Sequence, residues 1–66
     1  MVVTKEMHDD WKEFGFIPSL KGIELSVEDL QLIDEQLDLW DLAEQYIEKG
    51  DADGLHEVIT ALAQYE

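Results

Sequence analysis

One stretch decides the fold of this chain: residues 26–49, SVEDLQLIDEQLDLWDLAEQYIEK. It predicts a single long helix, because apolar residues recur at three- and four-residue spacings throughout it. Ser26 can cap the first turn, since its hydroxyl can accept a hydrogen bond from the amide of Asp29, and Gly50 suits the left-handed residue that ends a helix. At 1.5 Å per residue, such a helix is roughly 35 Å long.

The apolar residues of this helix cover about half of its circumference on a helical wheel. One stripe comprises Leu30, Ile33, Leu37, Trp40 and Ile47, and an adjacent stripe comprises Leu32, Leu39, Ala43 and Tyr46. A surface helix of a small monomer needs only about 100° of apolar face. We therefore expect the helix to contact a helix before it, a helix after it and, in a homodimer, its own copy. Asp29, Gln36 and Glu44 are expected at the rims of the apolar half.

Shorter helices are predicted on either side. Residues 5–14 follow the capping residue Thr4 and place Met7, Trp11 and Phe14 on one face. Core packing is the expected role of that face, and an exposed aromatic anchor for a partner is the alternative. Residues 52–64 follow the cap Asp51 and carry a core stripe: Leu55, Val58, Ile59, Leu62 and Tyr65. The short connection between the last two helices makes them antiparallel, as in an αα-hairpin.

Residues 15–25 connect the first helix to the long one. Pro18 excludes a helix interior there and favours extended backbone at Ile17. An ordered extended loop is expected, and a minor two-stranded ribbon that turns at Lys21 and Gly22 is the alternative. The predicted fold is therefore all-α. It is a small three-helix bundle in one domain, residues 1–66, built on the long central helix and the C-terminal αα-hairpin.

Charge restricts the partners of this protein. Seventeen acidic residues stand against four Lys and no Arg, which gives a formal net charge of −13. Direct nucleic-acid binding is not expected, since phosphate contacts need cations, and anionic membranes are disfavoured for the same reason. No apolar run reaches transmembrane length and no signal sequence opens the chain, so a cytoplasmic location is expected. A basic surface on another protein is the natural partner.

No arrangement of residues indicates catalysis or a cofactor. The chain has no Cys and no Gly-rich phosphate loop, and its many carboxylates follow from its charge, so we expect no enzyme activity. The sequence Asp51-Ala-Asp53-Gly54 resembles the start of a calcium loop. The sixth position is His56 in place of Gly, however, and the twelfth is Leu62 in place of Glu, so no calcium site is assigned.

The two histidines, His8 and His56, are further candidate metal ligands. Their separation in the sequence matches no known metal-binding motif. His8 adjoins Asp9 and Asp10, and such a group can bind a metal ion weakly. Exposed polar positions explain these three residues without an ion. No metal ligand is therefore assigned from the sequence.

An acidic stripe follows the polar face of the long helix: Asp34, Asp38, Asp41, Gln45 and Glu48, at spacings of four, three, four and three, bordered by Glu35. Like charges at these spacings destabilise a helix, and Lys partners are almost absent, so solubility alone explains the stripe poorly. Thirteen net charges along roughly 35 Å give about one per 2.7 Å, the same order as one per roughly 1.7 Å in duplex DNA. We expect the five carboxylates to bind a basic, nucleic-acid-binding protein.

In size and charge the chain resembles the small, acidic, Cys-free inhibitors of phages and mobile elements, which include anti-CRISPR and other DNA-mimic proteins. This resemblance implies a binding inhibitor. The heptapeptide LIDEQLD, residues 32–38, is similar to part of the IDEAL domain of some Firmicutes proteins. The following LWDLAEQY departs from that domain's charged continuation, so nothing further is implied.

The alternative function is a dimerisation or adaptor module, or an antitoxin, which binds its partner through apolar contacts of Leu39, Trp40 and Tyr46. Sixty-six residues without a disulfide lie near the lower size limit for independent folding. A homodimer is one way to complete such a small core.

Overall fold

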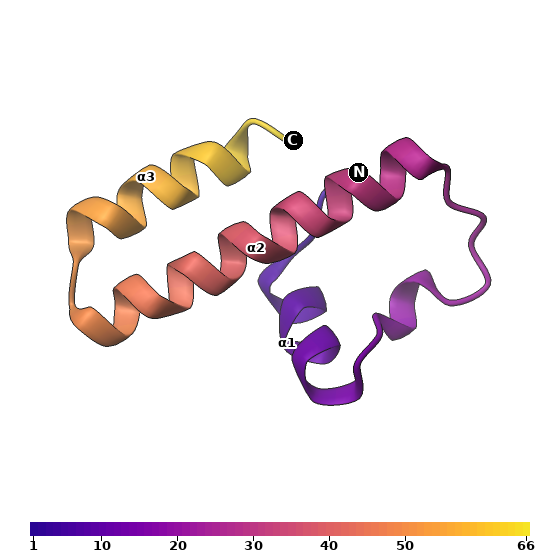
Figure 1. Ribbon diagram of the computed structural model, residues 1–66, viewed down its shortest axis with the longest axis horizontal. Coiled ribbons are helices and arrows are strands. Elements are labelled where there is room, and N and C mark those ends of the chain that lie inside the picture. The colour runs from indigo at the N-terminus through magenta and orange to yellow at the C-terminus, as the bar shows by residue number, and fades with distance from the viewer.

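The computed structural model describes residues 1–66 and contains helices only (Figure 1). The elements in chain order are α1 (Lys5–Phe14), the short 3₁₀ helix η1 (Pro18–Leu20), α2 (Val27–Lys49) and α3 (Ala52–Ala63). The predicted all-α class and the three α-helices are confirmed. No helix is both long and apolar enough to cross a membrane.

The connection between α1 and α2 contains η1 and no strand, so the two-stranded ribbon considered from the sequence is not formed. Pro18 begins η1, where its missing N–H group is not needed. The Lys21 amide donates to the Pro18 carbonyl over 3.1 Å, and the Leu20 amide donates to the Ile17 carbonyl over 3.0 Å. These local hydrogen bonds replace the strand pairing that a ribbon would require.

Each α-helix begins at a side-chain cap that the sequence shows. Thr4, Ser26 and Asp51 each accept a hydrogen bond from the amide three residues later, over 3.2, 3.1 and 3.0 Å. Gly15 and Gly50 end α1 and α2 with φ angles of 78° and 71°. This left-handed conformation is costly for residues with a Cβ atom, which explains glycine at both positions.

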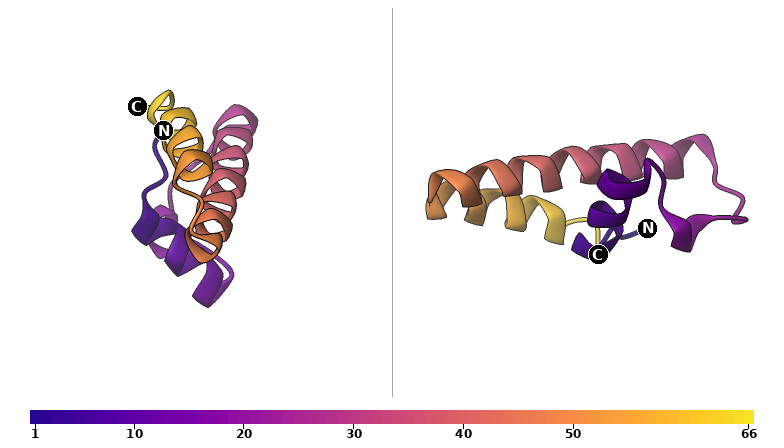
Figure 2. Two further views of the ribbon diagram at one scale, coloured as in Figure 1. Left: turned by 90° about the vertical axis from the view of Figure 1, so that its left-hand side faces the viewer. Right: turned by 90° about the horizontal axis from the view of Figure 1, so that it is seen from below.

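The helices form a flat arrangement that measures 37 × 25 × 14 Å along its principal axes. α3 runs antiparallel beside the C-terminal half of α2, whereas α1 is steeply inclined to α2 and lies near its middle (Figures 1 and 2). A single helix with its side chains is about 10–12 Å across. A molecule this thin therefore encloses few side chains. Only nine of the 66 residues are buried.

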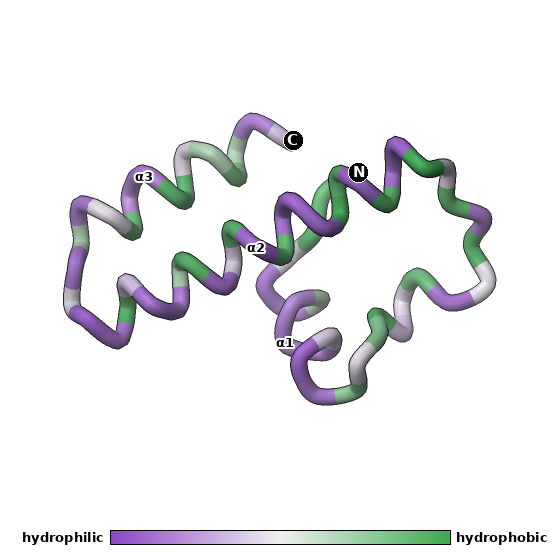
Figure 3. Tube along the Cα trace, viewed as in Figure 1, coloured by the Kyte–Doolittle hydropathy of each residue, from purple (hydrophilic) through white to green (hydrophobic).

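Two small apolar clusters lie at different positions along α2. The first core cluster comprises Val3, Ile17, Ile33 and Leu37, and the second core cluster comprises Ala43, Val58 and Leu62. Trp40 packs against both clusters. Hydrophobic and hydrophilic segments alternate along α2 and α3, as Figure 3 shows. Part of the wide apolar half of α2 thus serves two contacts within one chain, whereas Leu30 and Ile47 remain 50% and 57% exposed.

Gln36 was expected at the rim of the apolar half of α2, and this expectation is wrong. Its side chain is 0% exposed. The N-terminal segment passes over this position, and its backbone polar groups need partners there. The Gln36 amide supplies them, since it accepts from the Val3 amide over 2.7 Å and donates to the Met1 carbonyl over 2.8 Å.

The buried face of α1 also differs from the expected one. His8 was expected to be exposed and is 0% exposed, whereas Trp11 and Phe14 were expected in the core and are 36% and 53% exposed. Of the expected stripe, only Met7 packs against the first core cluster. The physical reason is polar, because α2 presents Asp41 toward α1, and the His8 imidazole hydrogen-bonds to it through Nε2 over 2.7 Å.

Candidate functional site

The outward face of α2 carries an exposed line of carboxylates. Asp34, Asp38 and Glu48 are exposed, and none of them takes part in an ion pair. Helix geometry places Asp34 and Glu48 roughly 21 Å apart along the axis. These three residues, called the acidic face below, present uncompensated negative charge to solvent.

Asp41 and Glu35, which were expected to bind the same partner, contact other residues of the chain. Asp41 Oδ1 lies 2.7 Å from His8 Nε2, and the Asp41 side chain is 40% exposed. Glu35 Oε2 accepts a hydrogen bond from the Tyr65 hydroxyl over 2.9 Å, which raises the pKa of Tyr65 above its ordinary value of 10.0. Of the five carboxylates expected to bind the partner, Asp34, Asp38 and Glu48 are therefore the three that contact no other side chain through an ion pair or a hydrogen bond.

Leu39, Trp40 and Tyr46, the alternative apolar interface, are half-buried and pack against the second core cluster. Trp40 Nε1 also donates to the Val3 carbonyl over 3.0 Å. The Tyr46 ring covers Gly54 so closely that a Cβ atom there would lie 2.6 Å from the nearest ring carbon. These three side chains hold the chain together, so an apolar interface would use another surface.

An open groove provides such a surface where α1, η1 and the N-terminal half of α2 meet. Its volume is about 400 Å³, and its apolar lining includes Trp11, Phe16, Leu20, Leu25, Leu30 and Ile33. Phe14 lies beside the groove, with its ring centroid 6.2 Å from that of Phe16. Asp34 of the acidic face and Lys21 also line it. The helical periodicity of α1 could not reveal this surface, because it suggested that the same aromatic rings were buried.

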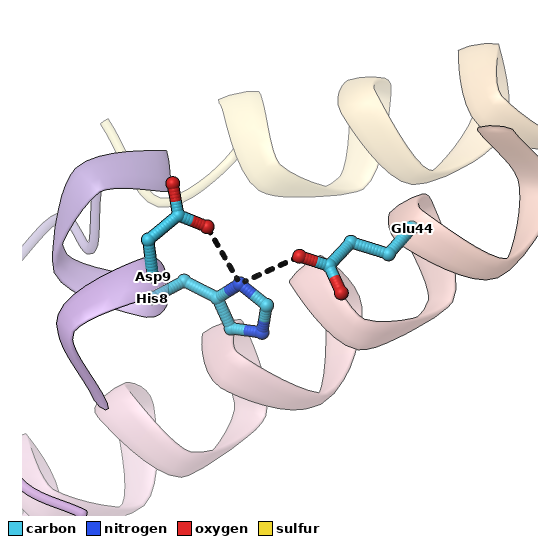
Figure 4. Close-up of side chains that lie close together, drawn as sticks. All are labelled: His8, Asp9 and Glu44. Carbon is cyan, nitrogen blue, oxygen red and sulfur yellow. Dashed lines mark ion pairs between the residues drawn. The ribbon is translucent and has the colours of Figure 1, made fainter. Parts of the chain in front are cut away.

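A polar cluster between α1 and α2 was not expected from the sequence (Figure 4). His8 Nδ1 lies 3.6 Å from Glu44 Oε1 and 4.0 Å from Asp9 Oδ1, while Nε2 faces Asp41. The Trp40 ring stacks on the imidazole, with 6.4 Å between the ring centroids. His8 and Asp41 are separated by 33 positions in the chain, and no local pattern predicts such a contact.

Two of the four lysines lie beside this cluster. Lys12 Nζ contacts Glu44 Oε2, and this hydrogen bond and the charge attraction raise the pKa of Lys12 above its ordinary value of 10.5. Lys5 Nζ lies 3.1 Å from Asp9 Oδ2. The negative charge around α1 is therefore partly compensated, unlike that of the acidic face.

Comparison of the chain with protein-family models, with curated proteins and with solved structures finds no match. What the protein binds must therefore be inferred from its own charge and geometry. Three features come into question: the acidic face of α2, the apolar groove at its N-terminal half, and the cluster around His8.

Proposed function

We propose that this protein is a binding inhibitor or regulator whose acidic face occupies a basic, nucleic-acid-binding surface of a partner protein. The observation that supports the proposal is the exposed line of unpaired carboxylates Asp34, Asp38 and Glu48 on one rigid helix. Only three of the seventeen acidic residues take part in ion pairs: Asp9, Asp41 and Glu44. A strong negative field is thus available to a partner that ordinarily binds phosphates.

This proposal places the protein with the phage or mobile-element inhibitors that act as DNA mimics or in the manner of anti-CRISPR proteins, in the cytoplasm. A helix that already holds its carboxylates in a line loses little conformational freedom on binding. Electrostatic screening then sets the affinity, because the Debye length shrinks from about 10 Å at 0.1 M salt to about 3 Å at 1 M. Partner binding is expected to weaken steeply as salt is added.

The test uses a partner captured from cell lysate on the immobilised full-length protein and then purified. Its affinity is measured at low and moderate salt, with and without a nucleic-acid fragment that the partner binds. The variant Asp34→Lys/Asp38→Lys/Glu48→Lys should weaken binding by about tenfold or more, because each reversal replaces an attraction with a repulsion. The nucleic acid should displace the wild-type protein.

The matched control is Glu24→Lys/Asp53→Lys/Glu57→Lys, which changes the net charge equally at exposed positions outside the acidic face. It should retain most of the affinity, and circular dichroism should show that both triple variants are helical. Equal weakening by the two variants would mean that net charge alone attracts the partner. Unchanged affinity in the first variant, or no competition by nucleic acid, would contradict the proposal.

A dimerisation or adaptor module is the second candidate, supported by the apolar groove. Trp11, Phe16 and Leu30 line the groove and are 36%, 52% and 50% exposed. Contiguous apolar surface of this kind is characteristic of protein interaction sites. Association through the groove would be nearly independent of salt and would be lost in Trp11→Ala/Leu30→Ala. Sedimentation at two salt concentrations distinguishes it from binding through the acidic face. An antitoxin that neutralises a basic toxin would use both surfaces.

A further inference from the structure

His8 contains a buried ring nitrogen without a hydrogen-bond partner. The side chain is 0% exposed, and Nδ1 faces Glu44 Oε1 at 3.6 Å and Asp9 Oδ1 at 4.0 Å (Figure 4). Both separations exceed the roughly 3.2 Å that an N–H···O hydrogen bond spans. A buried polar atom that lacks a partner destabilises the fold unless another group completes it. Three potential ligand atoms therefore converge here without a hydrogen bond between them.

Asp41 determines which nitrogen of the His8 ring carries the proton. Its Oδ1 lies 2.7 Å from Nε2, and because a carboxylate only accepts, Nε2 must donate. In the neutral ring, Nδ1 then directs a lone pair toward two negatively charged carboxylates, which is repulsive. A cation among these atoms converts the repulsion into attraction. A carboxylate that holds the far nitrogen of a metal-binding histidine is the common outer-shell arrangement of zinc proteins.

The distances within the cluster suit coordination of one ion. Zinc binds His nitrogen and carboxylate oxygen at about 2.0–2.2 Å, so two ligands of a tetrahedral ion lie about 3.3–3.6 Å apart. The ligand atoms of His8, Asp9 and Glu44 all lie within 4.8 Å of one another. Asp9 is 50% exposed and Glu44 is 32% exposed, so small side-chain rotations can bring them closer, and water can complete the coordination.

The two neighbouring lysines leave the converging oxygens free. Lys5 contacts Oδ2 of Asp9 and Lys12 contacts Oε2 of Glu44, whereas the other oxygen of each carboxylate faces His8. One imidazole nitrogen with two carboxylate oxygens suits zinc better than magnesium or calcium, which prefer oxygen ligands alone.

We propose that His8, Asp9 and Glu44 bind one divalent cation of the zinc type, and that Asp41 orients the imidazole for it. The ion joins α1 to α2, because two ligands come from α1 and one from α2. Such a site is independent of the acidic face and of any partner that binds there.

The experiment uses the full-length protein, stripped of metal with a chelator and titrated with Zn²⁺ and, separately, with Mg²⁺. Calorimetry should show one Zn²⁺ per chain and no comparable Mg²⁺ binding. The melting temperature should rise by about 20 °C at a free Zn²⁺ concentration of about 100 times the Kd. Co²⁺ should give the visible absorption spectrum of a tetrahedral site.

Asp9→Asn and Glu44→Gln should each weaken Zn²⁺ binding about tenfold or more, since each removes a charged ligand. These two variants decide the question because they keep the buried His8 ring in place, whereas His8→Gln also tests whether the fold survives. Asp38→Asn and Glu48→Gln remove equal charge from the acidic face and serve as matched controls. His56→Gln controls for the second histidine.

Nitrogen NMR of the His8 ring provides a readout apart from affinity. Zn²⁺ should shift the Nδ1 resonance, while Nε2 keeps its proton. The proposal is overturned if Asp38→Asn weakens binding as much as Asp9→Asn does, because the ion would then be attracted by the negative surface in general. It is also overturned if no 1:1 binding occurs, or if Nδ1 carries a proton in the presence of Zn²⁺.

Discussion

The Gln36 side chain binds the backbone of Val3 across the middle of α2, with 2.7 Å between Gln36 Oε1 and the Val3 amide nitrogen. The same side chain donates to the carbonyls of Met1 and Leu32 over 2.8 and 3.1 Å. Gln36 and Val3 are 0% and 2% exposed, so water does not replace these hydrogen bonds. One buried amide thus fastens the start of the chain to the central helix.

Gln36→Leu should lower the free energy of unfolding by about 1–3 kcal/mol, because it leaves the buried Val3 amide without a hydrogen-bond partner. Urea denaturation followed by circular dichroism measures the loss. Gln45→Leu, at an exposed position of the same helix, should change the stability by no more than about 0.5 kcal/mol. Equal stability of the two variants would show that the Gln36 contacts do not stabilise the fold.

Reversing the charge at Asp41 should have a different effect from reversing it at Asp38. Asp41→Lys removes the acceptor of buried His8 and places a cation beside it, which should lower the free energy of unfolding by about 2 kcal/mol. Asp38→Lys changes an exposed position and should cost no more than about 0.5 kcal/mol. Thermal and urea denaturation measure both. If Asp41→Lys is as stable as Asp38→Lys, the pairing with His8 contributes nothing.

Gly54→Ala should lower the stability by about 1 kcal/mol, although Ala favours a helix by about 1 kcal/mol over Gly. A Cβ atom at this position would lie 2.6–2.9 Å from three ring carbons of Tyr46, and such overpacking costs about 1–3 kcal/mol. When Tyr46 is replaced by Ala, the same Gly54→Ala substitution should become stabilising. A double-mutant cycle by urea denaturation measures the coupling, and additive effects would contradict the close packing.

Stability should fall at alkaline pH. The contacts of Tyr65 with Glu35 and of Lys12 with Glu44 raise the pKa values of Tyr65 and Lys12 above 10.0 and 10.5 in the folded chain. Because the folded-state pKa exceeds the unfolded one, this stabilisation is complete below about pH 10 and is lost as the pH rises through the folded-state values. Urea midpoints should decline above pH 10, and less so in Tyr65→Phe and in Lys12→Met. Lys21→Met, at a residue without an ion pair, should follow the wild-type profile.

The sequence determined where the helices begin and end. Each helix cap interacts with backbone groups only three or four positions away in the chain, so it can be recognised in the sequence. These residues are the N-terminal caps Thr4, Ser26 and Asp51 and the C-terminal residues Gly15 and Gly50. The line of carboxylates on α2 was predictable for the same reason, since a helix advances by a constant rotation per residue. Pro18 was informative in part: it excluded a long helix but did not distinguish a 3₁₀ turn from a ribbon.

Only the tertiary structure decided which face of α1 is buried and which polar groups lie inside. The Met7–Trp11–Phe14 pattern predicted a core face by hydrophobicity, but α2 presents Asp41 and Glu44 at the point where α1 crosses it. Burying His8 there gives Asp41 a hydrogen-bond partner, places Nδ1 3.6 Å from Glu44, and leaves two of the three apolar side chains exposed. His8 pairs with Asp41 across 33 positions and Gln36 pairs with Val3 across the same number. Contacts so distant in the chain depend on how the helices are oriented, and no local pattern of residues carries that information.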